Sequence, residues 1–418
     1  MWHRIKYNLD LIGTTFQSLF FLLLSCFVKR DDKSIAFGSW AGERYLDNSK
    51  YLAEYIRDID SSYHLFWIGK KSLRRIVEAQ NKQIVFLEKD KLSTNLKLLK
   101  CKYFFSTQSH STDISKCNVY HGAVKCYLHH GLPIKKIGLD TINNPDVGKG
   151  FYRTKIRPLL YRISGRLINY DYYATSSRYH ERVNSTAYKH WGYSDSKSLR
   201  CGTPRNDMLV KFNPEKAKAF KQFYASKYGF SEKKKVILYL PTFRRIKNNT
   251  FSFFTISEKE QSTLNSLLDS HNALILEKSH FRGSLATTDN NEELLKRLDE
   301  YDNVQELLCF ADILITDYSG AFLDFVLVNR PIIHFVYDYD EYKGADTGLY
   351  CNIGDFYAGN VASNIEDLMN SIADSLNCPS KYDERRKYIK QFFMEYEVGN
   401  SSESIFRKVI KKEENKNE

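Results

Sequence analysis

The hydrophobic positions after residue 34 fall into short apolar runs, rich in β-branched and aromatic residues, which alternate with longer stretches of helical periodicity. The runs predict strands near 34–38, 64–68, 83–87, 102–106, 124–128 and 170–175, and again at 235–240, 272–277, 312–316 and 331–336. The stretches between them predict helices at 46–59, 71–80, 91–100, 215–227, 258–270, 290–299, 318–328 and 363–376. Because such alternation is typical of right-handed βαβ units around a parallel sheet, the pattern predicts an α/β protein.

The alternation restarts after the segment CGTPRND at 201–207, whose glycine and proline make it the best candidate for a domain boundary. We therefore expect two Rossmann-like domains, at 34–204 and 205–396, whose sheets turn their C-terminal edges toward a central cleft. Beyond Lys381 the sequence predicts a charged helical tail that runs to a frayed, soluble end, with 397–418 as the charged C-terminal tail.

A second interruption lies at 141–169, where asparagine, proline and glycine precede a basic run. The basic residues are Arg153, Lys155, Arg157, Arg162 and Arg166. We expect an exposed insertion whose positive charge faces a membrane or an anionic acceptor; a solvated loop is the alternative.

The N-terminal residues 1–33 form a separate, membrane-associated helix in this prediction. Residues 11–28 are largely apolar, and Lys29 and Arg30 follow them directly. Polar residues within the run make a full span marginal, and no small-residue cleavage site is present, so an interfacial helix with basic flanks fits better. The alternative is a helix buried against its own domain.

Length and charge narrow the classes of partner. A chain of 418 residues favours two domains, and a net charge of +12 with a pI near 9.0 favours anionic partners such as nucleic acid, anionic lipid or phosphorylated substrates. We find no nucleic-acid-binding module, and the basic residues are dispersed, so nucleic acid is not expected. The eight cysteines lack CxxC pairing, which indicates reduced thiols of a cytoplasmic protein rather than a zinc site or disulfides.

The stretch YLHHGLPIKKIGLD at 127–140 is the strongest candidate for a reactive site. His129 and His130 follow an apolar run, so one is predicted to point inward and the other toward a cleft. Lys135 and Lys136 add positive charge that suits an anionic substrate. A packed histidine beside two solvated lysines is the alternative.

Polar residues also follow three predicted strands of the second half, within LPTFRR (240–245), EKSHF (277–281) and ITDYSGAFLDF (315–325). Taken singly, each has a simpler role as a helix cap, a surface charge or a core histidine. Taken together, they predict a cleft site with a phosphate seat at the start of the helix after 320. The candidate residues are Thr242, Arg244, Lys278, His280, Thr316, Asp317, Ser319 and Gly320.

A metal site is not predicted. Asp338 and Asp340 form a DxD pair, but a lone pair in a tyrosine-rich acidic loop favours solvated carboxylates, and the basic residues can neutralise an anionic substrate instead.

Six blocks, in this order and spacing, resemble the CDP-glycerol glycerophosphotransferases of teichoic-acid and capsule synthesis. They are SWAGERYLDNSKYLAEYI (39–56), HHGLPIKK (129–136), GTPRND (202–207), LPTFR (240–244), KSH (278–280) and TDYSGAFLDF (316–325). The resemblance implies a GT-B fold, with 34–204 on the acceptor and membrane side and 205–396 binding a CDP-alditol. It further implies peripheral or monotopic attachment at the cytoplasmic face of the bacterial membrane. The implied reaction transfers a polyol phosphate to a lipid-linked glycan with release of CMP and needs no further cofactor.

By matching position, His130 resembles the proposed catalytic base of that family, and His280 resembles its second essential histidine near the donor phosphates. Arg244, Asp317 and Ser319 match positions expected to hold the donor. Gly131, Lys135, Lys136, Thr242, Lys278, Thr316 and Gly320 complete the expected substrate-binding set. This division suits the chemistry, since an attacking hydroxyl needs a base and a departing CMP needs cationic and hydrogen-bonding partners.

Three departures from the family pattern leave the polyol open between glycerol, ribitol and another alditol, with a sugar phosphate as a further option. They are Gly320 in place of a second serine, Phe281 in place of a proline, and Thr347 in place of an arginine. A priming or capsule-type enzyme is as well supported as a polymerase. The alternatives are a GT-B glycosyltransferase that uses a nucleotide sugar and a non-catalytic basic protein that binds a membrane or nucleic acid; donor profiling separates them.

Overall fold

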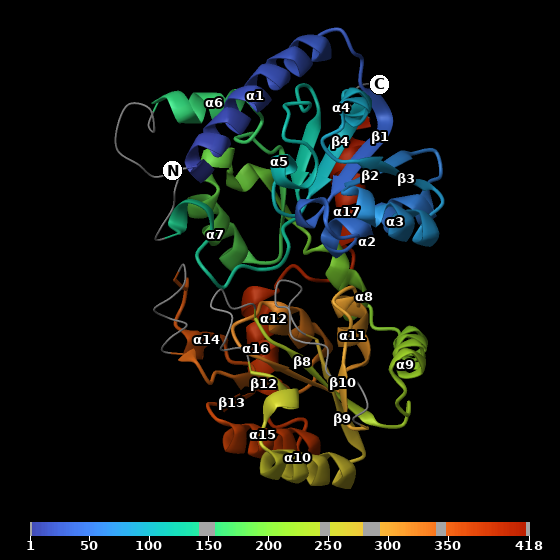
Figure 1. The fold of residues 1–418 in the computed structure, drawn as a ribbon, viewed down its shortest axis with the longest axis vertical. Helices are drawn as coiled ribbons and strands as arrows, with labels where there is room; N and C mark the ends of the chain where they lie inside the picture. Colours follow the sequence, from blue (N-terminus) through green and yellow to red (C-terminus); the bar gives the residue numbers. More distant parts are fainter. Residues whose placement is uncertain (1, 142–154, 243–250, 279–292, 340–347, 415–418) are drawn as a thin grey trace. The chain divides into compact units, whose positions relative to one another are not determined.

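The computed structural model describes residues 2–141, 155–242, 251–278, 293–339 and 348–414 (Figure 1). The chain forms two compact units. Unit 1 comprises Met1–His130, Ile137–Asp207 and Tyr396–Glu418, and unit 2 comprises Gly131–Lys136 and Met208–Glu395. Each unit is built on one parallel sheet, so the predicted α/β class is confirmed.

The sheet of unit 1 runs in the order β3-β2-β1-β4-β5-β6-β7, and every neighbouring pair is parallel. Its strands are β1 (Asp31–Gly38), β2 (His64–Gly69), β3 (Ile84–Glu88), β4 (Cys101–Ser106), β5 (Val124–Tyr127), β6 (Tyr172–Thr175) and β7 (Ser198–Arg200). Six of them were predicted, whereas the three-residue edge strand β7 was not. The order in which successive strands are added to the sheet reverses between β1 and β4, and ligands of open parallel sheets bind at the C-terminal side of such a switch point.

Both faces of this sheet are covered, as a parallel sheet requires. Ile35 and Phe37 pack with helices on one face, and Ala36, between them, packs on the other. The helices of unit 1 are α1 (Trp2–Ser25), α2 (Asp47–Ile59), α3 (Arg74–Gln80), α4 (Leu92–Leu98), α5 (His110–Asp113), α6 (Arg157–Ile163), α7 (Arg178–Ala187), α17 (Ser401–Ile405), the π-helix η10 (Phe406–Lys411) and α18 (Lys412–Glu414), with α8 (Asp207–Val210) at the junction with unit 2.

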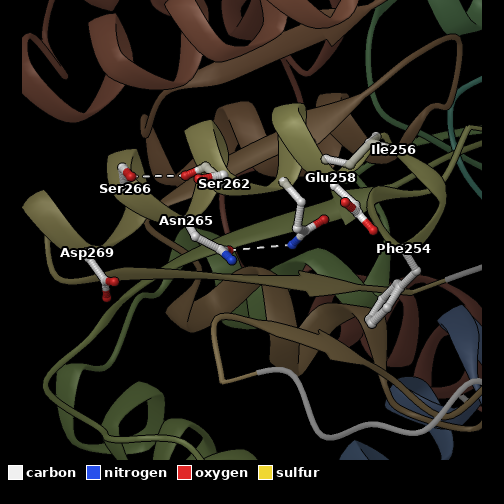
Figure 2. Close-up of a pocket in the computed structure, with 8 residues that line it drawn as sticks. Phe254, Ile256, Glu258, Ser262, Asn265, Ser266 and Asp269 are labelled. Atoms are coloured by element: carbon white, nitrogen blue, oxygen red, sulfur yellow. Dashed lines mark hydrogen bonds between the residues drawn. The ribbon is translucent and has the colours of Figure 1, made fainter.

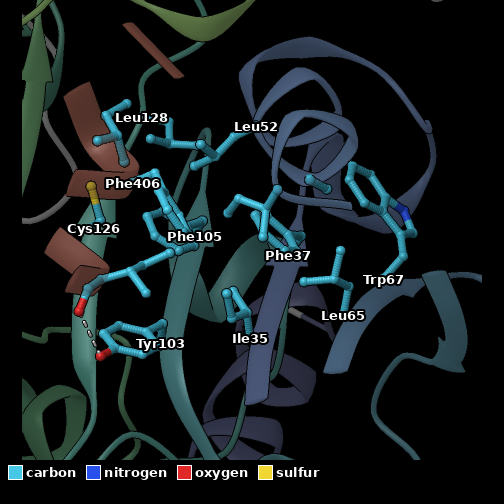
Figure 3. Packing of buried hydrophobic residues seen from close by; sticks show 14 of the residues in the cluster. Ile35, Phe37, Leu52, Leu65, Trp67, Tyr103, Phe105, Cys126, Leu128 and Phe406 are labelled. Atoms are coloured by element: carbon cyan, nitrogen blue, oxygen red, sulfur yellow. Dashed lines mark hydrogen bonds between the residues drawn. The ribbon is translucent and has the colours of Figure 1, made fainter. Parts of the chain in front are cut away.

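The segment expected to be a solvated tail is instead a core element of unit 1. Ile405, Phe406, Val409 and Ile410 are buried with the sheet residues, and the Tyr103 hydroxyl donates to the Ile410 carbonyl at 3.1 Å (Figure 3). The spacing of these apolar residues places them on one helical face, which the many charges around them obscure in the sequence. The prediction placed a boundary between residues 396 and 397 and treated the rest as a tail, whereas residues 397–414 belong to unit 1.

The sheet of unit 2 runs in the order β10-β9-β8-β11-β12-β13, again with parallel pairs, and reverses between β8 and β11. Its strands are β8 (Lys235–Leu240), β9 (Ala273–Glu277), β10 (Leu295–Arg297), β11 (Ile313–Thr316), β12 (Ile332–Phe335) and β13 (Asn360–Ala362). The helix predicted at 290–299 is wrong in its described part, because Leu295–Arg297 pairs with β9 as an edge strand.

The other predicted helices of this half are present. The described helices of unit 2 are α9 (Pro214–Tyr228), α10 (Glu258–Ser270), α11 (Val304–Phe310), α12 (Ala321–Phe325) continued by the 3-10 turn η9 (Val326–Val328), α14 (Ile353–Phe356), α15 (Ile365–Asn377) and α16 (Asp383–Phe393). Of these, α11 and α14 were not predicted, and α16 lies in the helical tail that was predicted beyond Lys381. Leu264 and Leu268 of α10 and Leu368 and Ile372 of α15 pack on the sheet.

One side of the N-terminal helix α1 packs against the rest of unit 1, and α1 lies beside α6 (Figure 1). Leu11 and Phe21 are buried, and the Ser18 hydroxyl accepts from the Asn118 amide and donates to the Ser164 carbonyl. Arg30, expected to flank a membrane helix, instead donates to the carbonyls of Val119 and His121. No helix among the described residues has the length and apolar character needed to cross a membrane.

Candidate active site

The switch point of unit 1 is held together by one buried carboxylate. Asp113 accepts hydrogen bonds from the backbone amides of Ala41 (2.9 Å), Thr107 (2.9 Å) and Gln108 (2.8 Å). Ala41 follows β1, and Thr107 and Gln108 follow β4, so this side chain joins the loops at both C-terminal strand ends. Burial raises the pKa of Asp113, while the three amides and the nearby imidazole of His130 oppose that rise.

His130 lies at the same edge, on the loop after β5, and its side chain is exposed. Its Nδ1 lies 3.0 Å from the Thr107 carbonyl oxygen. Because a carbonyl oxygen can only accept, Nδ1 must carry the proton, and in the neutral imidazole Nε2 then keeps its lone pair. This is the arrangement that a general base needs.

His129 is the inward-pointing partner that the alternation predicted. It is buried, its Nδ1 lies 3.3 Å from His180 Nε2, and its Nε2 lies 3.3 Å from Asn184 Nδ2. Burial lowers the pKa of His129 well below its usual range, and the adjacent imidazoles of His180 and His130 lower it further. His129 has a positive φ of 58°, a strained conformation that the Asn48 amide supports by donating to the carbonyls of Leu128 and His129.

His130 is linked to Arg205, Asp47 and Trp40 by a continuous series of contacts. Arg205 Nη1 lies 2.9 Å from both Asp47 Oδ1 and the His130 carbonyl oxygen. The Trp40 indole N–H donates to Asp47 Oδ2 at 3.0 Å, and the Trp40 ring meets the His130 ring edge-on at a centroid distance of 5.9 Å. Sequence reasoning assigned no role to Trp40, Asp47 or Arg205. Their signal was that they lie in the blocks at 39–56 and 202–207, which resembled the family together with the block containing His130.

The switch point of unit 2 gathers several predicted residues. The Asp317 carboxylate accepts from the Thr242 amide (2.9 Å), the Thr242 hydroxyl and the Tyr318 amide (2.6 Å). The Thr316 hydroxyl donates to the Leu240 carbonyl at 2.6 Å. Thr242, Thr316 and Asp317 therefore fasten the C-terminal ends of β8 and β11 to each other.

Ser319 and Gly320 lead into α12, and the Ser319 hydroxyl accepts from the Ala321 amide at 3.2 Å. The simpler interpretation of Ser319 as the N-cap is wrong, because Gly320 holds the N-cap position of α12. A Cβ on Gly320 would lie 3.3 Å from the Leu132 carbonyl oxygen, so the backbone of 131–136 passes close to this turn.

The segment 131–136 belongs to unit 2, although His130, the residue before it, belongs to unit 1. The Lys136 amide donates to the Gly348 carbonyl at 2.8 Å, and the Tyr350 amide donates to the Ile134 carbonyl at 3.1 Å. Lys135 pairs with Leu349 in an antiparallel bridge. Lys135 and Lys136 are thus anchored by backbone pairing to residues 348–350, and Gly131 begins the same segment.

Lys278 is buried, and its ammonium donates to the carbonyls of Asp299 and Glu300 at 2.8 Å each. These hydrogen bonds give the ammonium a structural role, and a substrate contact by Lys278 stays a prediction. His280 and Arg244 lie outside the described residues, as does Asp340 of the DxD pair. In the described part of the chain, no group of three or more histidine, cysteine, aspartate or glutamate side chains is arranged to hold a metal ion.

An open cavity of about 520 Å³ lies along α10 in unit 2 (Figure 2). It is lined by Phe254, Ile256, Glu258, Gln261, Ser262, Asn265, Ser266 and Asp269. None of the predicted site residues lines it, so it is separate from the candidate site.

Comparison with known proteins identifies relatives along almost the whole chain. Residues 19–411 match the family model described as CDP-Glycerol:Poly(glycerophosphate) glycerophosphotransferase. A teichoic acid glycerol-phosphate transferase of Staphylococcus aureus is 26% identical over 392 residues, which cover 90% of this chain and 92% of that protein. A teichoic acid poly(glycerol phosphate) polymerase of Bacillus subtilis is 25% identical over 98% of this chain, which spans only 52% of that polymerase.

Solved structures show the same fold. The wall teichoic acid polymerase TagF superposes with a TM-score of 0.76 at 22% identity, covering 99% of this chain and 97% of that chain. A UDP-GlcNAc 2-epimerase of Neisseria meningitidis superposes with a TM-score of 0.53 at 12% identity, covering 90% of this chain and all of that chain (100%).

Proposed function

The chain belongs to the family of CDP-glycerol:poly(glycerophosphate) glycerophosphotransferases, and from this premise we propose that it transfers glycerol phosphate from CDP-glycerol to a hydroxyl of a membrane-linked glycan. The acceptor is a teichoic-acid or capsule precursor, and CMP is released. The observation that carries the proposal is the hydrogen bond from His130 Nδ1 to the Thr107 carbonyl, because it leaves Nε2 as a proton acceptor at an exposed edge of the sheet.

The reaction needs one proton acceptor and one leaving group. The acceptor hydroxyl attacks the β-phosphorus of CDP-glycerol, the bond from that phosphorus to the bridging oxygen breaks, and CMP departs with the bond's electron pair. His130 Nε2 takes the hydroxyl proton, and the resulting imidazolium keeps its Nδ1–H bond to Thr107. General-base catalysis of this kind contributes about 10²- to 10⁴-fold in rate.

The donor is assigned to unit 2. Its switch point carries Thr242, Asp317 and Ser319 at the C-terminal ends of β8 and β11, where parallel sheets bind nucleotides. The fold shared with a UDP-GlcNAc 2-epimerase supports a nucleotide site of this type. His280 and Arg244 are proposed to balance the charge that develops on the departing phosphate, in a GT-B fold that requires no metal or other cofactor.

Peripheral attachment to the cytoplasmic face of the membrane is the second part of the proposal. On α1, the polar Thr14, Thr15 and Ser18 are buried, while Phe16 is 70% and Leu23 is 66% exposed. For a helix surrounded by water this pattern is unusual, because large apolar side chains are exposed and hydroxyl groups are buried. A lipid surface covering the exposed face explains it.

The exposed apolar face of α1 consists of Ile12, Phe16, Leu19, Phe20, Leu23 and Phe27 at the helix and its C-terminal end. Leu159 of the neighbouring α6 is exposed as well. These side chains lie at helical spacing on one stripe, so they can enter the headgroup region together while the opposite face of α1 remains packed on unit 1.

Donor profiling tests the proposal. Purified full-length protein with a lipid-linked acceptor in liposomes is given CDP-glycerol, CDP-ribitol or a panel of nucleotide sugars, and the released nucleotide is measured. CMP release from a CDP-alditol supports the proposed transfer and fixes the polyol, for which the relatives' names include both glycerol and ribitol. Turnover of a nucleotide sugar alone would overturn it in favour of glycosyl transfer.

A further inference from the structure

The peptide group that joins Thr107 to Gln108 lies between His130 and a buried carboxylate. Its carbonyl oxygen accepts from His130 Nδ1 at 3.0 Å, and its N–H donates to Asp113 Oδ2 at 2.8 Å. Because the C=O and N–H of one planar trans peptide point in opposite directions, these two bonds form a single chain from the carboxylate to the imidazole.

Asp113 is fully buried, and none of the described residues forms an ion pair with it, although Lys89 lies close enough for the two charges to interact. Both carboxylate oxygens instead accept hydrogen bonds from backbone amides. Oδ1 accepts from Ala41, and Oδ2 accepts from Thr107 and Gln108. Hydrogen bonds donated to both oxygens favour the ionised form, against the cost of burial. The buried carboxylate is thus linked, through these amides, to the loop that contacts His130.

We propose that Asp113 is a positioning residue that acts on His130 through the Thr107–Gln108 peptide group. The inference rests on the proposed role of His130 as the base. The carboxylate polarises the amide, which makes the Thr107 oxygen a stronger acceptor for the Nδ1 proton. It fixes the tautomer in which Nε2 is free and stabilises the imidazolium that forms when Nε2 takes the substrate proton. In a Ser-His-Asp triad the carboxylate contacts the imidazole directly; here one peptide group intervenes.

The same carboxylate holds the aromatic neighbour of His130. Trp40 and Ala41 have positive φ angles of 47° and 56°, which strain residues with side chains. The bond from the Ala41 amide to Asp113 supports this turn, and the turn places the Trp40 ring against the His130 ring. One residue therefore fixes both the proton and the packing of the imidazole.

Other charged groups lie near His130 or Asp113. Arg205 contacts the His130 carbonyl but is paired with Asp47, and His129 is kept neutral by burial. Lys89 lies close enough to Asp113 for the two charges to interact. Among these groups, Asp113 is the carboxylate that is hydrogen-bonded, through the Thr107–Gln108 peptide, to the His130 ring.

The first test uses the wild-type protein and needs no substitution at position 113. Full-length protein with ¹⁵N-labelled histidine is studied by NMR well above about pH 6.5, where an ordinary imidazole is neutral, and the His130 signals are assigned by their loss in His130→Gln. The proposal predicts a neutral His130 protonated at Nδ1. A neutral His130 protonated at Nε2 would overturn it.

The second test compares the pH dependence of kcat/KM for CMP release in wild type, Asp113→Asn and the control Asp195→Asn, an exposed aspartate of unit 1. Asp113→Asn is expected to lower kcat about 10- to 100-fold and to move the acid limb to lower pH, because the imidazole becomes a weaker base. Asp195→Asn should change neither. Loss of kcat with an unmoved acid limb would reduce Asp113 to a structural role.

A double variant separates this inference from the proposed function. If Asp113 acts through His130, the double substitution Asp113→Asn and His130→Gln turns over no more slowly than His130→Gln alone. Losses that multiply would overturn the inference while leaving His130 as the base. Wild-type turnover by His130→Gln would instead overturn the proposed role of His130.

Discussion

Arg205 Nη1 lies 2.9 Å from the His130 carbonyl oxygen, so an arginine 75 residues further along the chain holds the backbone of the candidate base. The same nitrogen bonds Asp47 Oδ1 at 2.9 Å, and Asp47 in turn accepts from the Trp40 indole. Three segments far apart in the sequence, at 39–56, 129–136 and 202–207, meet at this point. The resemblance of those segments to one family therefore has a common structural cause.

Replacement of Arg205 by methionine is expected to destabilise unit 1 by about 3 kcal/mol, because it leaves the buried Asp47 carboxylate without its cation. Turnover should fall as well, since the His130 carbonyl loses its donor. Urea unfolding and CMP release measure the two effects. The matched control is Arg200→Met, whose ion pair with Glu181 has an exposed arginine and should cost far less. Equal losses in both variants would contradict the structural role given to Arg205.

Replacement of Thr242 by valine removes the hydroxyl that donates to Asp317 but keeps the shape of the side chain. A hydrogen bond to a buried carboxylate contributes about 2 kcal/mol, so unit 2 should lose that much stability. The KM for CDP-glycerol should rise because the ends of β8 and β11 loosen at the proposed donor site. Steady-state kinetics with varied donor tests this, with Thr263→Val on α10 as the control. An unchanged KM would argue against a donor site at this edge.

Buried histidines make the protein sensitive to acid. Burial lowers the pKa of His180 and of His334 to about 3 and that of His129 well below its usual range. Because these side chains stay neutral in the folded state but bind protons when unfolded, their stabilising effect is complete above about pH 6.5 and is lost as the pH falls toward 3. Each contributes a slope of about 1.4 kcal/mol per pH unit within that window.

His180→Gln should therefore make the fall of the unfolding free energy between about pH 6.5 and 5 shallower by one such slope. Denaturant unfolding at a series of pH values measures it, and His121→Gln, at an exposed position, should leave the slope unchanged. Identical slopes in wild type and His180→Gln would show that His180 is not held neutral.

Substitution of Phe16, Phe20 and Leu23 by serine removes the centre of the exposed apolar face of α1. Each side chain that leaves water contributes about 1.5–3 kcal/mol, so binding to anionic liposomes should fall at least about 100-fold. Thermal stability should be little changed, since none of the three is buried. Cosedimentation with liposomes measures the binding, and Phe223→Ser, at a 58% exposed position on α9, is the control. Undiminished binding would contradict the proposed membrane contact by α1.

The sequence predicted most of the strands because each forms an apolar run of four or more residues. It missed β7, β10 and β13, which have three residues each and lie near or at sheet edges, where a run is too short to distinguish from a loop. The C-terminal residues 397–414 were mistaken for a tail because their four buried apolar residues are interspersed with lysines and glutamates.

His130 could be singled out because a histidine pair after a strand is a local signal, and its role as the base was implied by the resemblance of its block to the family. Its supporting residues could not, since Asp113 and Arg205 reach His130 only through the strand order and the loops at the switch point. Lys278 and Thr316 were predicted site residues, and nothing in the local sequence indicated that their side chains bond backbone carbonyls. Placement of His280 and Arg244 at the donor stays a prediction.

The role of His130 as the base is tested by the rate of CMP release from CDP-glycerol, with a lipid-linked acceptor present, in wild type, His130→Gln and the exposed-histidine control His121→Gln. We predict that His130→Gln loses about 10²- to 10⁴-fold in kcat while its unfolding curve matches wild type, and that His121→Gln keeps full activity. A His130→Gln protein that releases CMP at the wild-type rate would show that another group removes the proton.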